Sequence, residues 1–244
     1  MRRYRRFSLL PISGLYLLFA IASAWGQRVP PLAKQLDPAE TALVLVDFQN
    51  NFASPEGEHY RSYQKVFEET GMLENSVALV KKARALGIQV IQVTEAYSPD
   101  YRELDPSNPG GFHRSQILRQ AWKQGTARVE LYAPLRPGPD DRDILLPNRI
   151  AVSGFSGNSL HYILQQLGIR NVALGGFTTD GCVYATLLSA YDLGYHVYAL
   201  KDAMVSHEAE LAALLLRKSY PKYSRVLSSE EFLQMITAFQ AGKE

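Results

Sequence analysis

Short apolar runs alternate with longer amphipathic segments along most of the chain. The runs have the length and continuity that are typical of strands buried on both faces of a parallel sheet. The expected strands are residues 42–46, 88–93, 143–153, 171–174, 195–200 and 225–227. The expected helices, where apolar residues recur at helical spacing, are residues 73–86, 114–123, 159–167, 183–193, 208–216 and 229–239. This alternation predicts an α/β protein with a mostly parallel sheet and helices on both faces.

The first residues do not fit this pattern. A basic head, Met1–Arg6, precedes an apolar run that ends near Ala24 with small residues suited to signal cleavage. This order is typical of a secretory signal peptide, and the run is short for a membrane span. We therefore predict a signal peptide or, as the alternative, an N-terminal anchor over residues 1–24, a linker over 25–40 and one folded domain over 41–241. The folded part is expected to be exported, with the periplasm as its location.

Composition and charge exclude several classes of protein. Apolar residues make up 46% and charged residues 20% of the chain, which is ordinary for a globular protein and unlike a disordered one. Residues 1–24 contain four arginines and no acids, so the remainder has 22 basic and 24 acidic residues. No basic patch with aromatic residues remains, and we expect a small-molecule substrate, no nucleic acid and no membrane contact beyond the N-terminal segment.

Cys182, the only cysteine in the sequence, lies between the apolar run 171–174 and a helical pattern, beside several glycines. Unpaired N–H groups and a positive dipole at a helix start favour a thiolate over a thiol. Without a second cysteine in the chain, Cys182 is a buried structural residue, a thiol used between chains or a free reactive thiol. Its place between a strand and a helix favours the reactive thiol.

Polar residues also follow the first expected strand. Asp47 comes directly after the run 42–46, and amide side chains continue the segment through Asn51. Open α/β sheets bind ligands at the carboxyl ends of their strands. Asp47 is therefore a site candidate. The alternative, a turn or helix-cap residue, is less favoured because the amide cluster does not begin a helical pattern.

The segment Gly175–Val183, the later Lys201–Ala203 and Asp47 after the first strand together resemble the isochorismatase-like cysteine hydrolases. The resemblance covers about residues 36–239 and implies that the domain over 41–241 is an isochorismatase-like hydrolase domain. It implies a three-layer α/β/α sandwich of Rossmann-like topology. It also implies hydrolysis, with an amidase acting on a C–N bond of a small amide or carbamoyl compound through an acyl-enzyme. Relatives commonly form dimers or tetramers, so a homo-oligomer is compatible with the resemblance.

The resemblance assigns roles to individual residues. Cys182 matches the nucleophile, Asp47 matches the base that takes the thiol proton, and the N–H groups of Thr178 and Cys182 match an oxyanion hole. The family also has a cis peptide bond, which here would precede Thr178. The family's third catalytic residue, a lysine, is absent: depending on the direction of counting, its position falls on Arg149 or on Asn148. A guanidinium holds charge but stays protonated.

No metal and no other cofactor are expected, because the Asp-x-His and additional His of metal-binding relatives have no counterpart in residues 54–59. The expected pocket residues are aromatic or polar and lie near strand ends; they are Phe48, Gln49, Asn51, Phe52, Tyr97, Asn148, Phe155, Phe177 and Thr179. Two alternatives to an amidase stay open. One is a non-catalytic binding protein that lost turnover with the lysine, and the other is a redox-sensing thiol, which would need a partner thiol from another molecule.

Overall fold

The structure is a computed structural model that describes residues 31–242. Within these residues, a six-stranded parallel sheet forms the centre of the fold. In spatial order its strands are β3 (Ile144–Arg149), β2 (Gln89–Glu95), β1 (Thr41–Val46), β4 (Asn171–Phe177), β5 (His196–Val205) and β6 (Arg225–Leu227). Every neighbouring pair runs parallel. The strand order reverses between β1 and β4, and at such a switch point the strand ends open a crevice for a ligand. The predicted α/β class is confirmed.

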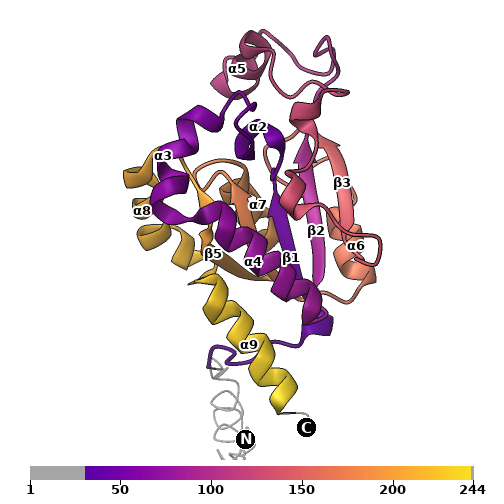
Figure 1. Ribbon diagram of the computed structural model, residues 1–244, viewed down its shortest axis with the longest axis vertical. Coiled ribbons are helices and arrows are strands. Elements are labelled where there is room, and N and C mark those ends of the chain that lie inside the picture. Colours follow the sequence, from indigo (N-terminus) through magenta and orange to yellow (C-terminus); the bar gives the residue numbers. More distant parts are fainter. Residues whose placement is uncertain (1–30, 243–244) are drawn as a thin grey trace, which may run out of the picture. The chain divides into compact units, whose positions relative to one another are not determined.

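Helices cover both faces of the sheet, which gives three layers (Figure 1). One face carries α3 (Tyr60–Thr70), α4 (Met72–Ala85) and α9 (Ser229–Ala241). The other carries α6 (Leu160–Gln166), α7 (Cys182–Asp192), α8 (Ala209–Lys218) and the 3-10 turn η5 (Tyr220–Lys222). Side chains of β1 alternate between the two cores: Leu43 and Leu45 face α4 and α9, whereas Val44 and Val46 face α6 and α7.

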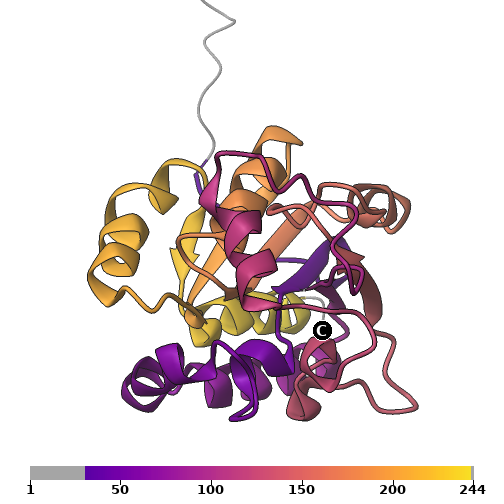
Figure 2. The ribbon, with the colours of Figure 1, turned by 90° about the horizontal axis from the view of Figure 1, so that it is seen from above.

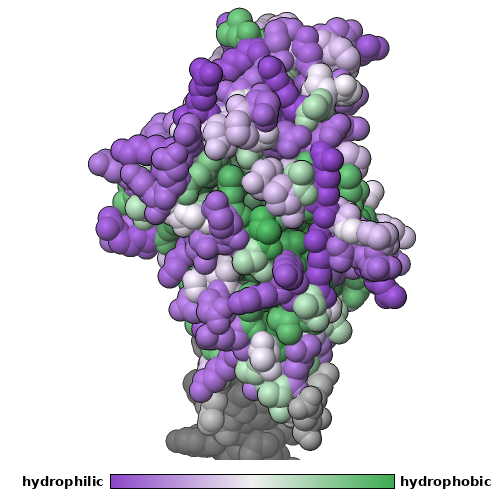
Figure 3. Space-filling view, viewed as in Figure 1, coloured by the Kyte–Doolittle hydropathy of each residue, from purple (hydrophilic) through white to green (hydrophobic). Residues whose placement is uncertain are grey.

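The helices of the first layer are amphipathic, which is why they lie flat on the sheet. In α4 the buried positions recur every three or four residues, from Met72 to Ala83. On the side that faces away from the sheet, this layer presents hydrophilic side chains over most of its surface, with apolar ones visible between them (Figure 3). Each fully buried Leu or Val stabilises the fold by about 1.5–3 kcal/mol relative to exposure.

The strand before the cysteine is longer than the sequence indicated. β4 continues through Gly175 and Gly176 to Phe177, so these glycines belong to the strand and not to a turn. The reason is close packing: a Cβ on Gly176 would lie 2.0 Å from the Val46 carbonyl oxygen, and one on Gly175 would lie 2.8 Å from the Ala203 carbonyl oxygen. Only glycine permits the neighbouring backbones to approach this closely.

The segment after β1 also differs from expectation. Asn50–Ala53 forms a single helical turn, α2, although the amide cluster had no helical pattern. The turn is held by hydrogen bonds from its own backbone to Gln49 and by one from the Asn50 N–H to the Glu130 carbonyl oxygen (2.9 Å). Tertiary contact, rather than periodicity, therefore makes this turn helical.

The long irregular stretch between β2 and β3 covers the carboxyl edge of the sheet. It contains α5 (Gly111–Arg119) and the 3-10 turns η3 (Ala127–Val129) and η4 (Ala133–Leu135). The helix expected over 114–123 is observed as α5, which begins at Gly111 and ends at Arg119. It ends there because the next residue, Gln120, adopts a left-handed conformation (φ 55°). Figure 2, which looks at the molecule from above, shows α5 and its flanking loops lying across this edge.

Part of the expected linker belongs to the compact unit, which begins at Lys34. Leu36 is buried in the core, and its N–H donates to the Met235 carbonyl oxygen (3.1 Å). The 3-10 turn η2 (Pro38–Glu40) then leads into β1. The predicted signal or anchor, residues 1–24, lies outside the residues that the structure describes, and export stays a prediction. Between residues 31 and 242 no helix is both long enough and apolar enough to cross a bilayer.

Candidate active site

Four chemically reactive or charged side chains meet at the carboxyl edge of the sheet. Asp47 follows β1, Glu95 ends β2, Arg149 ends β3 and Cys182 begins α7 after β4. All four residues are buried. One carboxylate oxygen of Asp47, one of Glu95 and the Sγ of Cys182 lie within 4.8 Å of one another. Since parallel strands end at a common edge, residues far apart in the sequence converge here.

Arg149 is the cation of this cluster. Its Nη2 donates to both carboxylate oxygens of Asp47 (2.7 and 2.5 Å) and lies 3.7 Å from Glu95 Oε2, while its Nη1 donates to the Val152 carbonyl oxygen (2.8 Å). The side chains of Arg149 and Asp47 are both fully buried. Asn148, in the left-handed conformation (φ 60°), is exposed. Of the two candidates for the family lysine position, Arg149 is the one that reaches Asp47.

The Asp47 backbone is held in an unusual turn. Its φ is 59°, its N–H donates to the Val93 carbonyl oxygen (2.9 Å), and its own carbonyl oxygen accepts from the Gln49 N–H (2.7 Å). The Gln49 side chain then links neighbouring segments, donating to the carbonyl oxygens of Glu95 (2.8 Å) and Val129 (2.7 Å) and accepting from the Glu95 N–H (2.9 Å). Gln49 therefore fixes the ends of β1 and β2 relative to each other.

The two carboxylates differ in their proton affinity because only one of them is paired closely with the guanidinium. Burial, reinforced by the negative charge of Asp47, raises the pKa of Glu95 to about 8. The Tyr97 hydroxyl donates to Glu95 Oε1. Burial also raises the pKa of Asp47, but the charge and hydrogen bonds of Arg149 oppose this rise. Although burial disfavours the charged form of Arg149, Asp47 raises its pKa above the ordinary value.

Cys182 differs from its expected state. Burial raises the pKa of its thiol well above the ordinary value, the charges of Asp47 and Glu95 add to the rise, and Arg149 opposes it. The expectation of a resting thiolate was based on the helix start and is wrong, because desolvation and two nearby acids outweigh the helix dipole. Cys182 rests as a thiol and has to lose its proton before it can attack a substrate.

The turn between β4 and α7 presents backbone N–H groups beside the sulfur. The peptide bond between Phe177 and Thr178 is cis, as the resemblance indicated. Within residues 31–242, the N–H groups of Thr178 and Cys182 donate to no other protein group. The Thr178 carbonyl oxygen accepts from the N–H groups of Gly181 (3.0 Å) and Val183 (3.2 Å), which fixes the turn. Both free N–H groups are available to an oxygen bound next to Cys182.

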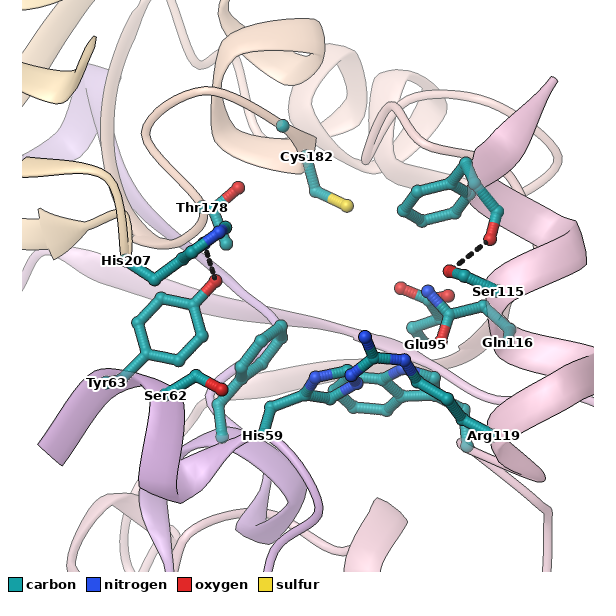
Figure 4. Close-up of a pocket in the computed structure, with 14 residues that line it drawn as sticks. His59, Ser62, Tyr63, Glu95, Ser115, Gln116, Arg119, Thr178, Cys182 and His207 are labelled. Atoms are coloured by element: carbon teal, nitrogen blue, oxygen red, sulfur yellow. Dashed lines mark hydrogen bonds between the residues drawn. The ribbon is translucent and has the colours of Figure 1, made fainter.

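A cavity of about 260 Å³ lies in front of the cysteine. In Figure 4 the sulfur of Cys182 points into it, with Tyr63 and His207 on one side and Gln116 and Arg119 on the other. The cavity is lined by Phe52, His59, Ser62, Tyr63, Glu95, Phe112, Ser115, Gln116, Arg119, Trp122, Thr178, Gly181, Cys182 and His207. Since ligand pockets commonly measure about 300–1,000 Å³, this one suits a small molecule.

Most of the expected pocket residues lie elsewhere, with Phe52 as the one that lines the cavity. The buried residues Phe48, Gln49, Asn51, Tyr97, Phe177 and Thr179 pack behind the wall, Asn148 is exposed, and Phe155 is half-buried against Tyr195. The reason is the direction of the aromatic side chains. Phe177, for example, stacks on Phe52 (ring centroids 4.6 Å apart) from the core side, so that only Phe52 reaches the cavity.

Several cavity residues were not expected from the sequence. Glu95 has the same signal as Asp47, an acid at the end of a buried strand, and could have been found by the same argument. Arg119, Gln116 and Trp122 come from the irregular stretch, whose path over the sheet has no periodic signal. Burial, together with the charges of Arg119 and His207, lowers the pKa of His59 to about 4, so this cavity histidine is neutral.

The cluster of Asp47, Glu95 and Cys182 has the donor types of a metal site, but it does not fit a metal ion. The Arg149 guanidinium binds both oxygens of Asp47 and lies beside Glu95. A second cation at the same carboxylates would be repelled by this buried charge.

The parallel sheet and the buried aspartate, arginine and cysteine at its switch point define an α/β protein with a cysteine-centred site. Comparison with known proteins identifies the family. The family model described as the Isochorismatase domain matches residues 41–231. Ureidoacrylate amidohydrolase RutB of Acinetobacter baylyi is 33% identical over 186 residues, which are 72% of this chain and 75% of that protein. The chain belongs to the isochorismatase family and is a hydrolase of that family.

Solved structures share the fold of this chain. A cysteine hydrolase from Pseudomonas syringae pv. phaseolicola matches with a TM-score of 0.69 and 22% identity, over 86% of this chain and 99% of that one. N-carbamoylsarcosine amidase from Thermoplasma acidophilum matches with a TM-score of 0.60 and 24% identity, over 78% of this chain and 97% of that one. Both likenesses concern the three-layer fold.

Proposed function

We propose that the protein is an amidase that hydrolyses a C–N bond of a small amide or carbamoyl compound. The observation that carries this proposal is that the Cys182 thiol, which lines a small cavity, lies within 4.8 Å of a carboxylate oxygen of Asp47 buried behind it. Relatives named as a ureidoacrylate amidohydrolase and an N-carbamoylsarcosine amidase support the same reaction type.

In this reaction Cys182 is the nucleophile and Asp47 is its base. As Sγ attacks the substrate carbonyl carbon, the thiol proton passes to Asp47, and the carbonyl oxygen becomes an oxyanion. The N–H groups of Thr178 and Cys182 stabilise that oxyanion; removal of one such donor in enzymes of this kind costs about 3–4 kcal/mol of transition-state stabilisation. Loss of the amine leaves an acyl group on Cys182, and water then releases it.

Arg149 acts here as a fixed positive charge. It keeps Asp47 as a carboxylate between turnovers and balances the charge that develops when the thiol loses its proton. Because a guanidinium does not release a proton near neutral pH, Arg149 is not a proton carrier.

The substrate is small and has an apolar part and a polar or anionic part. Phe52 and Trp122 form one wall of the cavity, and their aromatic rings lie 5.0 Å apart. Arg119 and Gln116 also line the cavity, across from Tyr63 and His207, and offer hydrogen-bond donors. A guanidinium at the wall favours an anionic substituent on the substrate.

A screen of small amides, ureides and carbamoyl compounds tests this function, with ammonia or amine release as the readout. We expect Cys182→Ala to abolish hydrolysis of every substrate that the wild type turns over. Unchanged turnover by Cys182→Ala would exclude the cysteine mechanism. If titration calorimetry shows that the wild type binds compounds from the screen but no product is released, the protein is the non-catalytic binding member of the family.

Thiol alkylation is a poor substitute for this screen. A raised thiol pKa makes the iodoacetamide rate at neutral pH slow in a catalytic protein as well as in a non-catalytic one. Product release is therefore the decisive measurement.

A further inference from the structure

Glu95 has no role in the mechanism so far, although it lines the cavity together with Cys182. We propose that Glu95 is a second catalytic acid and base of this site: it gives a proton to the leaving nitrogen and later takes one from the hydrolytic water. This assignment rests on the proposed amidase function. It supplies the proton carrier that the arginine in place of lysine cannot provide.

The positions of the two carboxylates separate their tasks. Asp47 is completely buried, is bound through both oxygens by Arg149 and does not line the cavity. It can exchange a proton with Cys182 but does not face the bound substrate. Glu95 is also buried, with its side chain 3% exposed, yet that small exposure is toward the cavity. A Glu95 carboxylate oxygen lies within 4.8 Å of the Cys182 sulfur, and Figure 4 shows Glu95 at the cavity on the side of Gln116.

The charges of the neighbours decide which carboxyl group carries the proton. Two buried acids share one buried cation, and the cation is 2.5–2.7 Å from Asp47 but 3.7 Å from Glu95. The negative form is therefore stabilised on Asp47, and the proton resides on Glu95. A Glu95 pKa of about 8 agrees with this distribution. The Tyr97 hydroxyl donates to Oε1, which leaves Oε2 to carry the proton.

The proton transfers then balance without a lysine. First, Sγ bonds to the carbonyl carbon and the thiol proton moves to Asp47. Next, the C–N bond breaks, and the nitrogen takes the proton of Glu95, which becomes a carboxylate. Water then adds to the thioester carbon as Glu95 takes one of its protons. Finally, the C–S bond breaks, and the sulfur recovers its proton from Asp47, so that all three groups return to their starting forms.

Other titratable groups around Glu95 do not take over this task. From the elements packed against it, the facing groups are Asp47, Tyr97, Arg149 and Cys182, with His59 and Arg119 on the cavity side. Arg149, whose pKa Asp47 raises above the ordinary value, gives up no proton near neutral pH, and burial raises the pKa of Tyr97 well above its ordinary value. Because the pKa of His59 is lowered to about 4, its ring is a neutral imidazole at neutral pH and lacks the acidic imidazolium proton that a general acid would donate.

Glu95→Gln tests the proposal, because glutamine keeps the shape and the hydrogen-bonding oxygen but cannot transfer a proton. The wild type and the variant are compared on an amide and on 4-nitrophenyl acetate, whose leaving group departs without being protonated. We expect amide turnover by the variant to fall about 10²–10⁴-fold, the usual contribution of general acid–base catalysis. We expect 4-nitrophenolate to appear as a burst of one equivalent followed by slow turnover, with an acetyl group on Cys182 detected by mass spectrometry.

Controls separate this proposal from the proposed function and from a folding defect. If the wild type gives neither amide turnover nor a Cys182-dependent burst, the amidase function itself fails. If the wild type is active and folded Glu95→Gln keeps its amide turnover and its pH profile, the role of Glu95 is wrong. Glu95→Asp keeps a carboxyl group and should recover part of the lost amide activity; equal losses in both variants would also overturn the proposal. Glu103→Gln, an exposed acid outside the cavity, should change nothing.

Discussion

Two arginine–aspartate pairs lie at opposite ends of β3, and they differ in how completely their polar groups are satisfied. Near the start of the strand, Arg84 donates to both oxygens of Asp143 (3.1 and 2.8 Å) and to the Leu135 carbonyl oxygen (3.1 Å). The Arg84 side chain is 19% exposed and has Asp141 as a further partner at 3.3 Å. Near the end of the strand, Arg149 is fully buried with Asp47.

The difference between the pairs is an excess of acid in the buried one. The Arg84 pair joins α4 to the segment before β3, and the Gln92 side chain completes it by donating to Asp143 (3.2 Å). The Arg149 pair has a second buried carboxylate, Glu95, and a buried thiol beside it, while in residues 31–242 its Nε finds no acceptor. A buried ion pair with more acidic groups than cations destabilises the folded state. The same arrangement provides the proton donors and acceptors that proton-transfer chemistry requires.

The largest expected effect separates the two arginines. Arg149→Met leaves two buried carboxylates without a cation, so we expect a loss of about 3–5 kcal/mol of unfolding free energy. Activity per folded molecule should fall by at least about 10²-fold, because a protonated Asp47 no longer accepts the thiol proton. Chemical denaturation and steady-state kinetics on the best substrate of the screen measure both quantities.

Arg84→Met is the matched control for this variant. It removes the same side-chain atoms from a half-buried pair, and we expect a loss of about 1–3 kcal/mol with kcat/KM within a few-fold of the wild type. Equal losses of activity in the two variants would mean that Arg149 acts only through stability, and the distinction between the pairs would collapse.

The next effect is a pH dependence of stability that comes from the excess acid. Glu95 has a folded pKa of about 8 against an ordinary value of 4.5, so the native protein retains a proton that the unfolded chain has lost. Stability therefore falls as pH rises toward 8, by up to about 1.4 kcal/mol per pH unit. Urea unfolding between pH 6.5 and 8 measures this slope. His59, whose pKa is lowered to about 4, destabilises the folded protein only below pH 6.5, so it does not contribute in this range.

Two variants assign the slope to a residue. Glu95→Gln should flatten it, whereas Asp143→Asn, in the satisfied pair, should leave it in place. If the slope survives in Glu95→Gln and disappears in Asp47→Asn, the shared proton resides on Asp47, and the distribution of charge inferred from the Arg149 distances is wrong.

The sequence could reveal one part of this site and not the other. The apolar runs predict the sheet. Asp47 could be recognised because it directly follows a strand, and Cys182 because it lies in a distinctive local sequence between a strand and a helix. The orientation of Arg149 was not predictable, since it depends on the left-handed Asn148, which interrupts the alternation of β3. For the same reason counting could not decide between these two residues.

The electrostatic state of the site was also out of reach of the sequence. The helix start at Cys182 is local and visible, but its burial and the approach of Glu95 depend on how the irregular stretch after β2 folds back over the sheet. Polar residues such as Gln49 look like pocket residues in the sequence; in the structure they satisfy backbone groups of neighbouring strands. Long-range packing, not local pattern, determines these features.

The smallest expected effect concerns the solvent-facing partner of the satisfied pair. Asp141 is 29% exposed, lies 3.3 Å from Arg84 and also accepts from the Gly138 N–H (2.8 Å). Asp141→Asn keeps an acceptor oxygen and removes only the charge, so we expect a loss below about 1 kcal/mol that shrinks further in high salt, with kcat/KM unchanged. Unfolding of this variant and the wild type at 0.05 and 1 M NaCl measures it. Solvent normally replaces a missing charged partner at the surface, but it cannot do so beside the buried Asp47. A salt-independent loss of several kcal/mol in Asp141→Asn would therefore show that the Arg84 pair depends on charge balance as strongly as the Arg149 pair.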